Sequence, residues 1–211
     1  MEDLLKKLNI EFNETKRPKA IQTLNDLIEA AEKLVEGGNV EDFAARSLSR
    51  TSGYSLGSLI KRLGRIENIF IYAITSGRSK KIQSIGKSLE AINRDADVND
   101  FVNELVDITF KSLQAMNPRV IRYYEKRAAT RAEYVTDVFT YTNEIIAPLK
   151  NIIANNRSST MRTLGDHEMQ YICRAIFLFI ERPFVEGDLI AGTEIHRKMA
   201  IENITSLLVA K

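Results

Sequence analysis

Gly53 and Gly64 are each expected to end a short helix. The positions of these two helix ends constrain the fold more than any other feature of the sequence. Glycine ends helices because it adopts the left-handed conformation without steric cost. Between the two glycines, Ser55 suits the N-cap of a helix, since its hydroxyl can accept a hydrogen bond from a free N–H near Ser58. Two short helices joined by a tight glycine turn, the second with small residues at its leading end, predict a helix-turn-helix.

Apolar residues recur at helical spacing along nearly the whole chain, which predicts an all-α fold. No stretch alternates with period two for long enough to predict a strand. Pro18 suits the first turn of one helix, and the next is expected to begin at Asn39 with Asp42 in a capping box. Arg182-Pro183 is expected to separate the last two helices. The predicted helices cover 18–37, 39–52, 55–63, a fourth from 66 that bends or ends near Gly77 or Gly86, 98–116, 118–127, 130–153, 166–181 and 186–210.

Basic residues are concentrated around the predicted helix-turn-helix. The whole chain carries a net charge of +2. Residues 43–87 hold nine basic residues against one acidic residue, which gives this segment +8 and leaves −6 for the remainder. A basic block in an otherwise acidic protein is the charge pattern expected for contact with phosphate groups, and the competing interpretation is a solvated charged face. Combined with the helix-turn-helix spacing, the charge favours DNA.

The composition indicates a cytoplasmic protein. Charged residues at positions 2, 3, 6 and 7 do not suit a signal peptide, and the longest strongly apolar run, 175–180, is too short to span a membrane. The single cysteine, Cys173, cannot form an internal disulfide and fits a reducing compartment. Burial as a small apolar side chain is the interpretation favoured for Cys173.

No catalytic constellation stands out, so we expect neither an enzyme nor a bound cofactor or metal. The two histidines, His167 and His196, are isolated in the sequence and are interpreted as surface or capping residues. Adjacent residues on a helix point in different directions, so Asp166-His167-Glu168 cannot share one ion. Glycine loops of the phosphate-binding or dinucleotide type are absent from the sequence.

The run Gly53-Tyr54-Ser55-Leu56-Gly57-Ser58-Leu59 resembles the Gly-Val-Ser-x-Gly-Thr-Leu run of the tetracycline-repressor (TetR) family of transcription regulators. The resemblance extends over about the first seventy residues. It is carried by Leu27, Ala30, Ala31, Leu34, Gly38, Leu48, Gly53, Ser55, Gly57, Ser58, Leu59, Leu63, Glu67 and Ile69. It implies an N-terminal three-helix DNA-binding domain over residues 1–66 and a C-terminal helical bundle for ligand binding and dimerisation over 67–211.

The resemblance also implies which side chains meet DNA. The free amides at the start of the helix that Ser55 opens favour a phosphate oxygen, and Lys61 and Arg62 can reach base edges one turn later. Arg46 and Arg50 suit phosphate clamps, while Tyr54 either packs the turn or donates its hydroxyl to phosphate, packing being favoured. The predicted DNA-binding residues are Arg46, Arg50, Tyr54, Ser55, Gly57, Ser58, Lys61, Arg62 and Arg65.

The sequence departs from the family pattern at four positions. Ile60 replaces a tyrosine and Ile66 a lysine, two residues that contact the DNA backbone in relatives. Leu63 replaces an aromatic residue, and Ala44 stands where relatives often have a capping threonine. Arg65 is expected to substitute for the missing lysine.

In the C-terminal half, aromatic residues at helical spacing are interpreted either as the lining of a ligand cavity or as plain core, core being the commoner outcome. The predicted ligand-binding residues are Phe101, Phe110, Tyr123, Tyr134 and Phe139. The family resemblance implies a small-molecule inducer of apolar or amphipathic character.

The last two predicted helices are rich in apolar residues on most faces, which favours burial against a second subunit, with burial inside the monomer as the alternative. The predicted dimerisation residues are Ile172, Ile176, Phe177, Ile180, Ile201, Ile204 and Leu208.

The hypothesis from sequence is a ligand-responsive transcriptional regulator, expected to be a repressor, that binds palindromic double-stranded operator DNA as a homodimer through residues 39–65. Activation and repression would use the same surfaces. The alternative is a helical interaction protein or enzyme that keeps the fold without specific DNA binding, which Ile60 and Ile66 favour.

Overall fold

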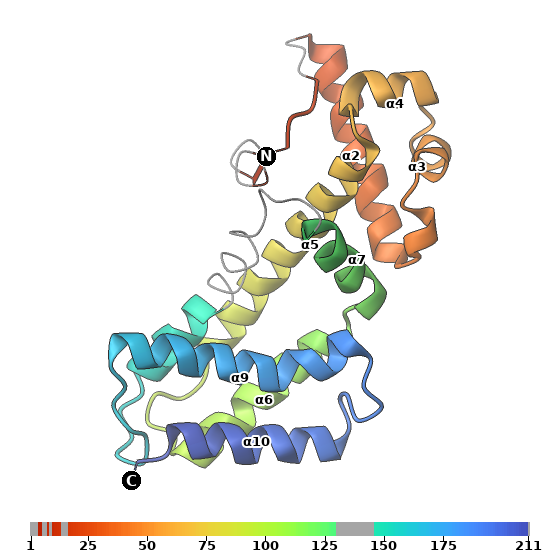
Figure 1. Cartoon of the computed structure of the whole chain (residues 1–211). Coiled ribbons are helices and arrows are strands. Elements are labelled where there is room, and N and C mark those ends of the chain that lie inside the picture. Colours follow the sequence, from red (N-terminus) through yellow and green to blue (C-terminus); the bar gives the residue numbers. More distant parts are fainter. Residues whose placement is uncertain (1–3, 6–7, 9, 14–16, 130–145, 211) are drawn as a thin grey trace. The chain divides into compact units, whose positions relative to one another are not determined.

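The computed structural model describes residues 4–5, 8, 10–13, 17–129 and 146–210, and this part of the chain is built from helices (Figure 1). In these ranges, Met161 and Val209 form one isolated antiparallel β-bridge. The all-α prediction is confirmed. No helix in the same ranges is long and apolar enough to cross a membrane. The helices are α2 (Pro18–Gly37), the 3₁₀ helix η1 (Val40–Asp42), α3 (Ala45–Ser52), α4 (Leu56–Leu63), α5 (Ile66–Leu89), α6 (Val98–Gln114), α7 (Pro118–Ala129), α9 (Asp166–Glu186) and α10 (Glu194–Leu208), with further helical residues at 146–154.

The chain forms two compact units, each with its own core. The first unit comprises Met1–Lys80 and Arg119–Val135, and the second comprises Lys81–Pro118 and Thr136–Lys211. The division therefore falls within α5, and α7 belongs to the first unit although it follows α6 in sequence. The boundary predicted from the sequence, between residues 66 and 67, would instead assign nearly all of α5 and the whole of α7 to the second domain.

Aromatic stacking organises the core of the first unit. Phe43 stacks on Phe70 of α5 with ring centroids 4.9 Å apart, and Tyr123 of α7 meets Phe43 edge-on at 5.1 Å. Such pairs add stability beyond the apolar area that they bury. Val120 and Tyr124, also on α7, are buried in the same core. These contacts explain why α7 packs with the N-terminal helices.

The helix between Gly38 and Gly53 begins later than predicted. The side chain of Asn39 donates to the Asp42 carboxylate at 2.9 Å and does not cap a backbone N–H. The segment it opens is the single 3₁₀ turn η1, and α3 begins only at Ala45, with Ala44 as its N-cap. The expected helix over 39–52 was therefore wrong in its first half.

Two further predicted breaks are absent. α5 continues past Gly77 and Gly86 to Leu89. Likewise α9 runs through Pro183 to Glu186, so the last helix begins at Glu194 and not at residue 186.

His196 explains why α9 tolerates a proline. Pro183 has no N–H to donate to the carbonyl of Phe179, one turn earlier. Nε2 of His196 lies 2.9 Å from that carbonyl oxygen, and its Nδ1 accepts the N–H of Gly192 at 3.1 Å. Because Nδ1 is an acceptor, Nε2 carries the proton and replaces the missing donor. His196 is 2% exposed, so it is not a surface residue, and its ring bonds the two backbone groups named above.

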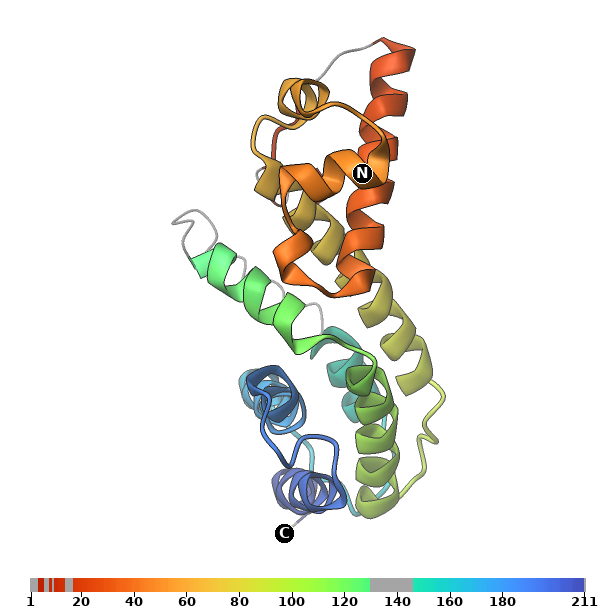
Figure 2. The same cartoon turned by 90° about the vertical axis from the view of Figure 1, so that its right-hand side faces the viewer.

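In the second unit α6, α9 and α10 pack side by side (Figure 2). Arg197 of α10 binds Asp107 of α6 through two N–H groups at 2.7 and 3.1 Å, and it also donates to Asn103 at 3.0 Å. Cys173 is fully buried in this core, and burial raises the pKa of its thiol to about 12. The thiol is therefore held neutral, which agrees with a purely structural role.

Candidate nucleic-acid interface

The turn between α3 and α4 is closed by side chains on both of its sides. Gly53 ends α3 in the left-handed conformation, with φ of 75°. The Ser49 hydroxyl donates to the carbonyl of Tyr54 at 2.6 Å, and the Tyr54 N–H donates to the Ser52 hydroxyl at 3.3 Å. Both the N–H and the carbonyl of Tyr54 are therefore hydrogen-bonded, which stabilises the conformation of the turn.

The side chain of Tyr54 ties the turn to α2. Its hydroxyl donates to the carboxylate of Asp26 at 2.6 Å, and Gln22 donates to the same carboxylate at 2.7 Å. The bond from Tyr54, followed by that from Gln22, lowers the pKa of Asp26, whereas the bond to Asp26 raises the pKa of Tyr54. The ring of Tyr54 is partly buried against the core of the first unit.

α4 begins and ends as predicted. The hydroxyl of Ser55 accepts the N–H of Ser58 at 3.3 Å, and Gly64 ends the helix. Leu59 and Leu63 are fully buried and fix one face of the helix in the core of the first unit. The opposite face is open to solvent. The burial of Leu59 and Leu63 therefore determines which residues of α4 face the solvent.

The last turn of α4 is capped from the N-terminal segment. Asn13 donates its backbone N–H to the carbonyl of Arg62 at 2.9 Å and its side-chain amide to the carbonyl of Lys61 at 3.0 Å. The last carbonyls of a helix have no partner within it, so Asn13 satisfies two that α4 cannot. The neighbouring Ile10 and Phe12 are buried, which holds Asn13 in place. Sequence reasoning missed this cap because its partners lie 48 residues or more away.

The predicted cations line the open side of α3 and α4. Arg46 and Arg50 are exposed on α3, and Lys61 is exposed at the end of α4. Arg50 lies 3.9 Å from Asp42, a long pair between exposed side chains that contributes little to stability. Within the described ranges no ion pair engages Arg46, Lys61, Arg62 or Arg65. Their charge is therefore available to a partner.

Gly57 has no structural explanation among the described residues. Its φ is not in the left-handed region, and a Cβ placed on it would have no atom within 4 Å. Glycine inside a helix costs about 1 kcal/mol relative to alanine. Folding of α4 therefore gives no reason for a glycine at this position.

The predicted ligand-binding aromatics are not brought into one group. Phe101 and Phe110 are buried in the core of the second unit, where Phe110 meets Phe184 and the ring of His196 at 5.3 and 4.5 Å. Tyr123 lies in the first unit. Tyr134 and Phe139 lie outside the described residues.

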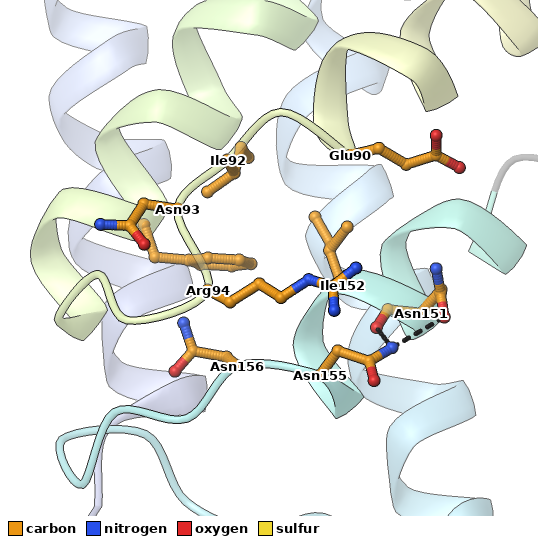
Figure 3. A pocket seen from close by; sticks show the side chains of 9 residues that line it. Glu90, Ile92, Asn93, Arg94, Asn151, Ile152, Asn155 and Asn156 are labelled. Atoms are coloured by element: carbon orange, nitrogen blue, oxygen red, sulfur yellow. Dashed lines mark hydrogen bonds between the residues drawn. The ribbon is translucent and has the colours of Figure 1, made fainter.

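A small pocket beside Phe101 is bordered mainly by polar side chains (Figure 3). Its free volume of about 20 Å³ suits one or two water molecules and is far below that of a drug-sized ligand. No sequence pattern indicated this pocket, because the residues that line it come from two separate segments. The lining residues are Glu90, Ile92, Asn93, Arg94, Phe101, Asn151, Ile152, Asn155 and Asn156. In the described part of the chain, no three His, Cys, Asp or Glu residues converge as a metal site.

Most of the predicted dimerisation residues pack inside the second unit. Phe177 and Ile201 are partly exposed, while Ile172, Ile176, Ile180, Ile204 and Leu208 are buried among side chains of their own chain. The alternative interpretation, burial within the monomer, thus applies to these five. Apolar side chains that are exposed on the same two helices are Tyr171, Leu178, Phe179, Ile195 and Met199.

Comparison with known proteins finds similarity in structure only. No family model matches the chain, and no curated protein matches its sequence. A tetR-family transcriptional regulator from Streptomyces coelicolor superposes with a TM-score of 0.60 at 10% identity, covering 88% of this chain and 80% of its own. A candidate tetR-family transcription regulator from Shewanella sp. PV-4 gives 0.53 at 14% identity, with coverage of 90% and 99%. A transcriptional regulator from Rhodococcus sp. Rha1 gives 0.59 at 13% identity, with coverage of 87% and 96%.

The chain has the fold of TetR-family regulators. The resemblance inferred from the helix-turn-helix residues is thereby confirmed at the level of fold, and it extends over nearly the whole chain. In this fold the turn at Gly53 and the helix that begins at Leu56 form the helix-turn-helix.

Tyr54→Phe is expected to remove an acid-sensitive contribution to the stability of the first unit. The pKa of Asp26 is lowered in the folded state, so its contribution is complete above the ordinary aspartate value of about 3.9 and is lost as pH falls through the lowered value. The stability gap between wild type and variant should therefore be full near pH 6 and close in acid. Urea unfolding of both proteins over a pH series measures it. A gap that does not change with pH would contradict the assignment.

Asn13→Ala is expected to loosen the last turn of α4. It leaves the carbonyl of Lys61 without its donor, at a cost of about 0.5–1.5 kcal/mol. Amide hydrogen exchange at Leu63 and Gly64 should accelerate. Asn13→Asp has the same shape but cannot donate, so it should behave like alanine. Unchanged exchange in both variants would show that the cap does not stabilise α4.

Proposed function

We propose that the chain is a ligand-responsive transcription regulator, a repressor, that binds palindromic operator DNA as a homodimer through residues 39–65. The observation that carries the proposal is α4: a rigidly anchored helix whose open face combines a bare backbone at Gly57 with Lys61, a cation that no acid among the described residues pairs. A helix with this combination suits the major groove, where backbone and side chains approach base edges closely.

Electrostatics supports duplex DNA as the partner. The segment that carries the cations of α3 and α4 holds few acids, since Glu67 is the one acidic residue between positions 43 and 87. Arg46 and Arg50 suit phosphate contacts that set the orientation, and Lys61 and Arg62 suit base contacts. Arg65, exposed just beyond Gly64, suits the phosphate contact that Ile66 cannot make. The structural neighbours that are named as TetR-family transcription regulators support the same function.

Replacing Lys61 or Arg62 by alanine should weaken operator binding by about 1–3 kcal/mol for each base contact that the substitution removes. Lys198→Ala is the matched control, because it removes an exposed lysine of α10 in the second unit. Fluorescence anisotropy with duplexes from the DNA flanking the gene measures the affinity, and log affinity should fall steeply with log salt. Absence of specific retention by folded wild-type protein at low salt would overturn the proposal in favour of a fold that no longer reads DNA.

The dimer contact is proposed for the exposed apolar residues of α9 and α10. Tyr171 and Leu178 lie two helical turns apart on α9, and Ile195 and Met199 lie one turn apart on α10. Each pair therefore shares a helix face. Exposed apolar residues gathered on two neighbouring helices are typical of a protein–protein contact. A symmetric dimer also matches a palindromic operator, because each protomer then reads one half-site.

Leu178→Glu is expected to convert the dimer to a monomer, because it places a charge where the two protomers would exclude water. Leu189→Glu is the control: Leu189 is 96% exposed in the loop before α10, against 52% for Leu178. Sedimentation velocity separates the two species. Leu178→Glu should also weaken operator binding, since a single half-site remains per molecule. If Leu178→Glu remains a dimer, the dimer contact does not involve this face of α9.

For the inducer we keep an apolar or amphipathic molecule, and of the predicted residues we keep Phe101 and Phe110, which both lie on α6 in the second unit. The aromatic contacts of Phe110 support an apolar environment on this helix. An inducer that binds more tightly to a DNA-incompetent form shifts the population towards that form, and operator binding weakens by the same coupling energy.

A further inference from the structure

Two exposed apolar side chains of α4 have no role within the described part of the chain. Leu56 and Ile60 are 43% and 59% exposed, although the other two leucines of this helix are fully buried. Neither belongs to the core of the first unit, nor to the partly buried residues that pack against it. They lie four residues apart and therefore on the same face.

Their neighbours define what can cover them. Lys61 is exposed next to Ile60, and Gly57 lies next to Leu56 with open space above it. A partner for this face must therefore be negatively charged, come close to the backbone, and still offer apolar groups. Duplex DNA in the major groove meets all three conditions, because every thymine presents a C5 methyl group there.

Leucine and isoleucine side chains cannot form hydrogen bonds, so they cannot read guanine, cytosine or adenine by donor and acceptor pattern, nor can they bind phosphate. The thymine methyl is the apolar feature of the groove that they can contact. Burying one methyl group is worth about fourfold in affinity, enough to distinguish thymine from cytosine at the same position.

We propose that Leu56 and Ile60 select thymine in the operator by contact with its C5 methyl group. The proposal rests on the function above, in which α4 enters the major groove. Four residues of helix span about 6 Å, close to two base-pair steps of about 3.4 Å. The two thymines should therefore lie within about two steps of each other in each half-site. Ile60, which replaces the backbone-contacting tyrosine of the family pattern, thus has a reading role of its own.

The experiment exchanges thymine for uracil, which removes only the methyl group. Wild-type protein first selects its operator from a pool of random duplexes. Each thymine of one half-site is then replaced by uracil, and affinities are measured by fluorescence anisotropy. At two thymines, wild type should lose about fourfold in affinity. Leu56→Ala should be insensitive to the exchange at one of them, and Ile60→Ala at the other.

Ile21→Ala is the matched control, because it removes a 51% exposed isoleucine from α2 in the same unit and should keep the full fourfold sensitivity. All three substituted side chains are exposed, so the variants should fold, and thermal unfolding checks this. The exchange on wild type tests the methyl contact without any variant.

Three results would overturn the inference. They are a selected half-site without thymine, affinities that uracil does not change, or full sensitivity to uracil in both alanine variants. In each of these the protein still binds a defined, salt-sensitive operator, so the proposed function stands. Binding with no sequence preference is a separate outcome, and it removes the proposed function together with the inference.

Discussion

An eight-residue helix is not stable alone in water, so everything that α4 presents depends on how it is held. Leu59 and Leu63 bury one face, Ser55 satisfies the amino end, and Asn13 satisfies the carboxyl end from a distant part of the chain. Tyr54 adds a bond from the preceding turn to Asp26. The position of the open face is therefore set by contacts that lie elsewhere on the helix and in the first unit.

The second unit is maintained by a different kind of compensation. Pro183 removes a backbone donor from α9, and His196 of α10 supplies one in its place. Arg197, the next residue, binds Asp107 and so joins α10 to α6. Successive residues of one helix thus secure it to two neighbours. Polar groups that are satisfied in this way specify one arrangement of helices, whereas an apolar core alone would accept several.

Prediction from the sequence succeeded where the determinants are local. Gly53, Ser55 and Gly64 act on their own helices, and the structure has the predicted ends of α3 and α4 at these residues. Prediction failed where a residue distant in sequence determines the local structure. The helix continues through Pro183 because His196 supplies the missing donor, and Asn13 caps the end of α4. It also did not separate the buried apolar residues of α9 and α10 from the exposed ones, because helical period gives spacing without saying which side faces the core.

Gly57 has a consequence for how this protein tolerates change. Alanine there would meet no neighbouring atom and would favour the helix, so folding alone does not require glycine. If DNA approaches the backbone at this point, the requirement comes from the partner. Stability and recognition then oppose each other at one residue, and variants chosen only for thermal resistance would tend to lose the interface while the fold improved.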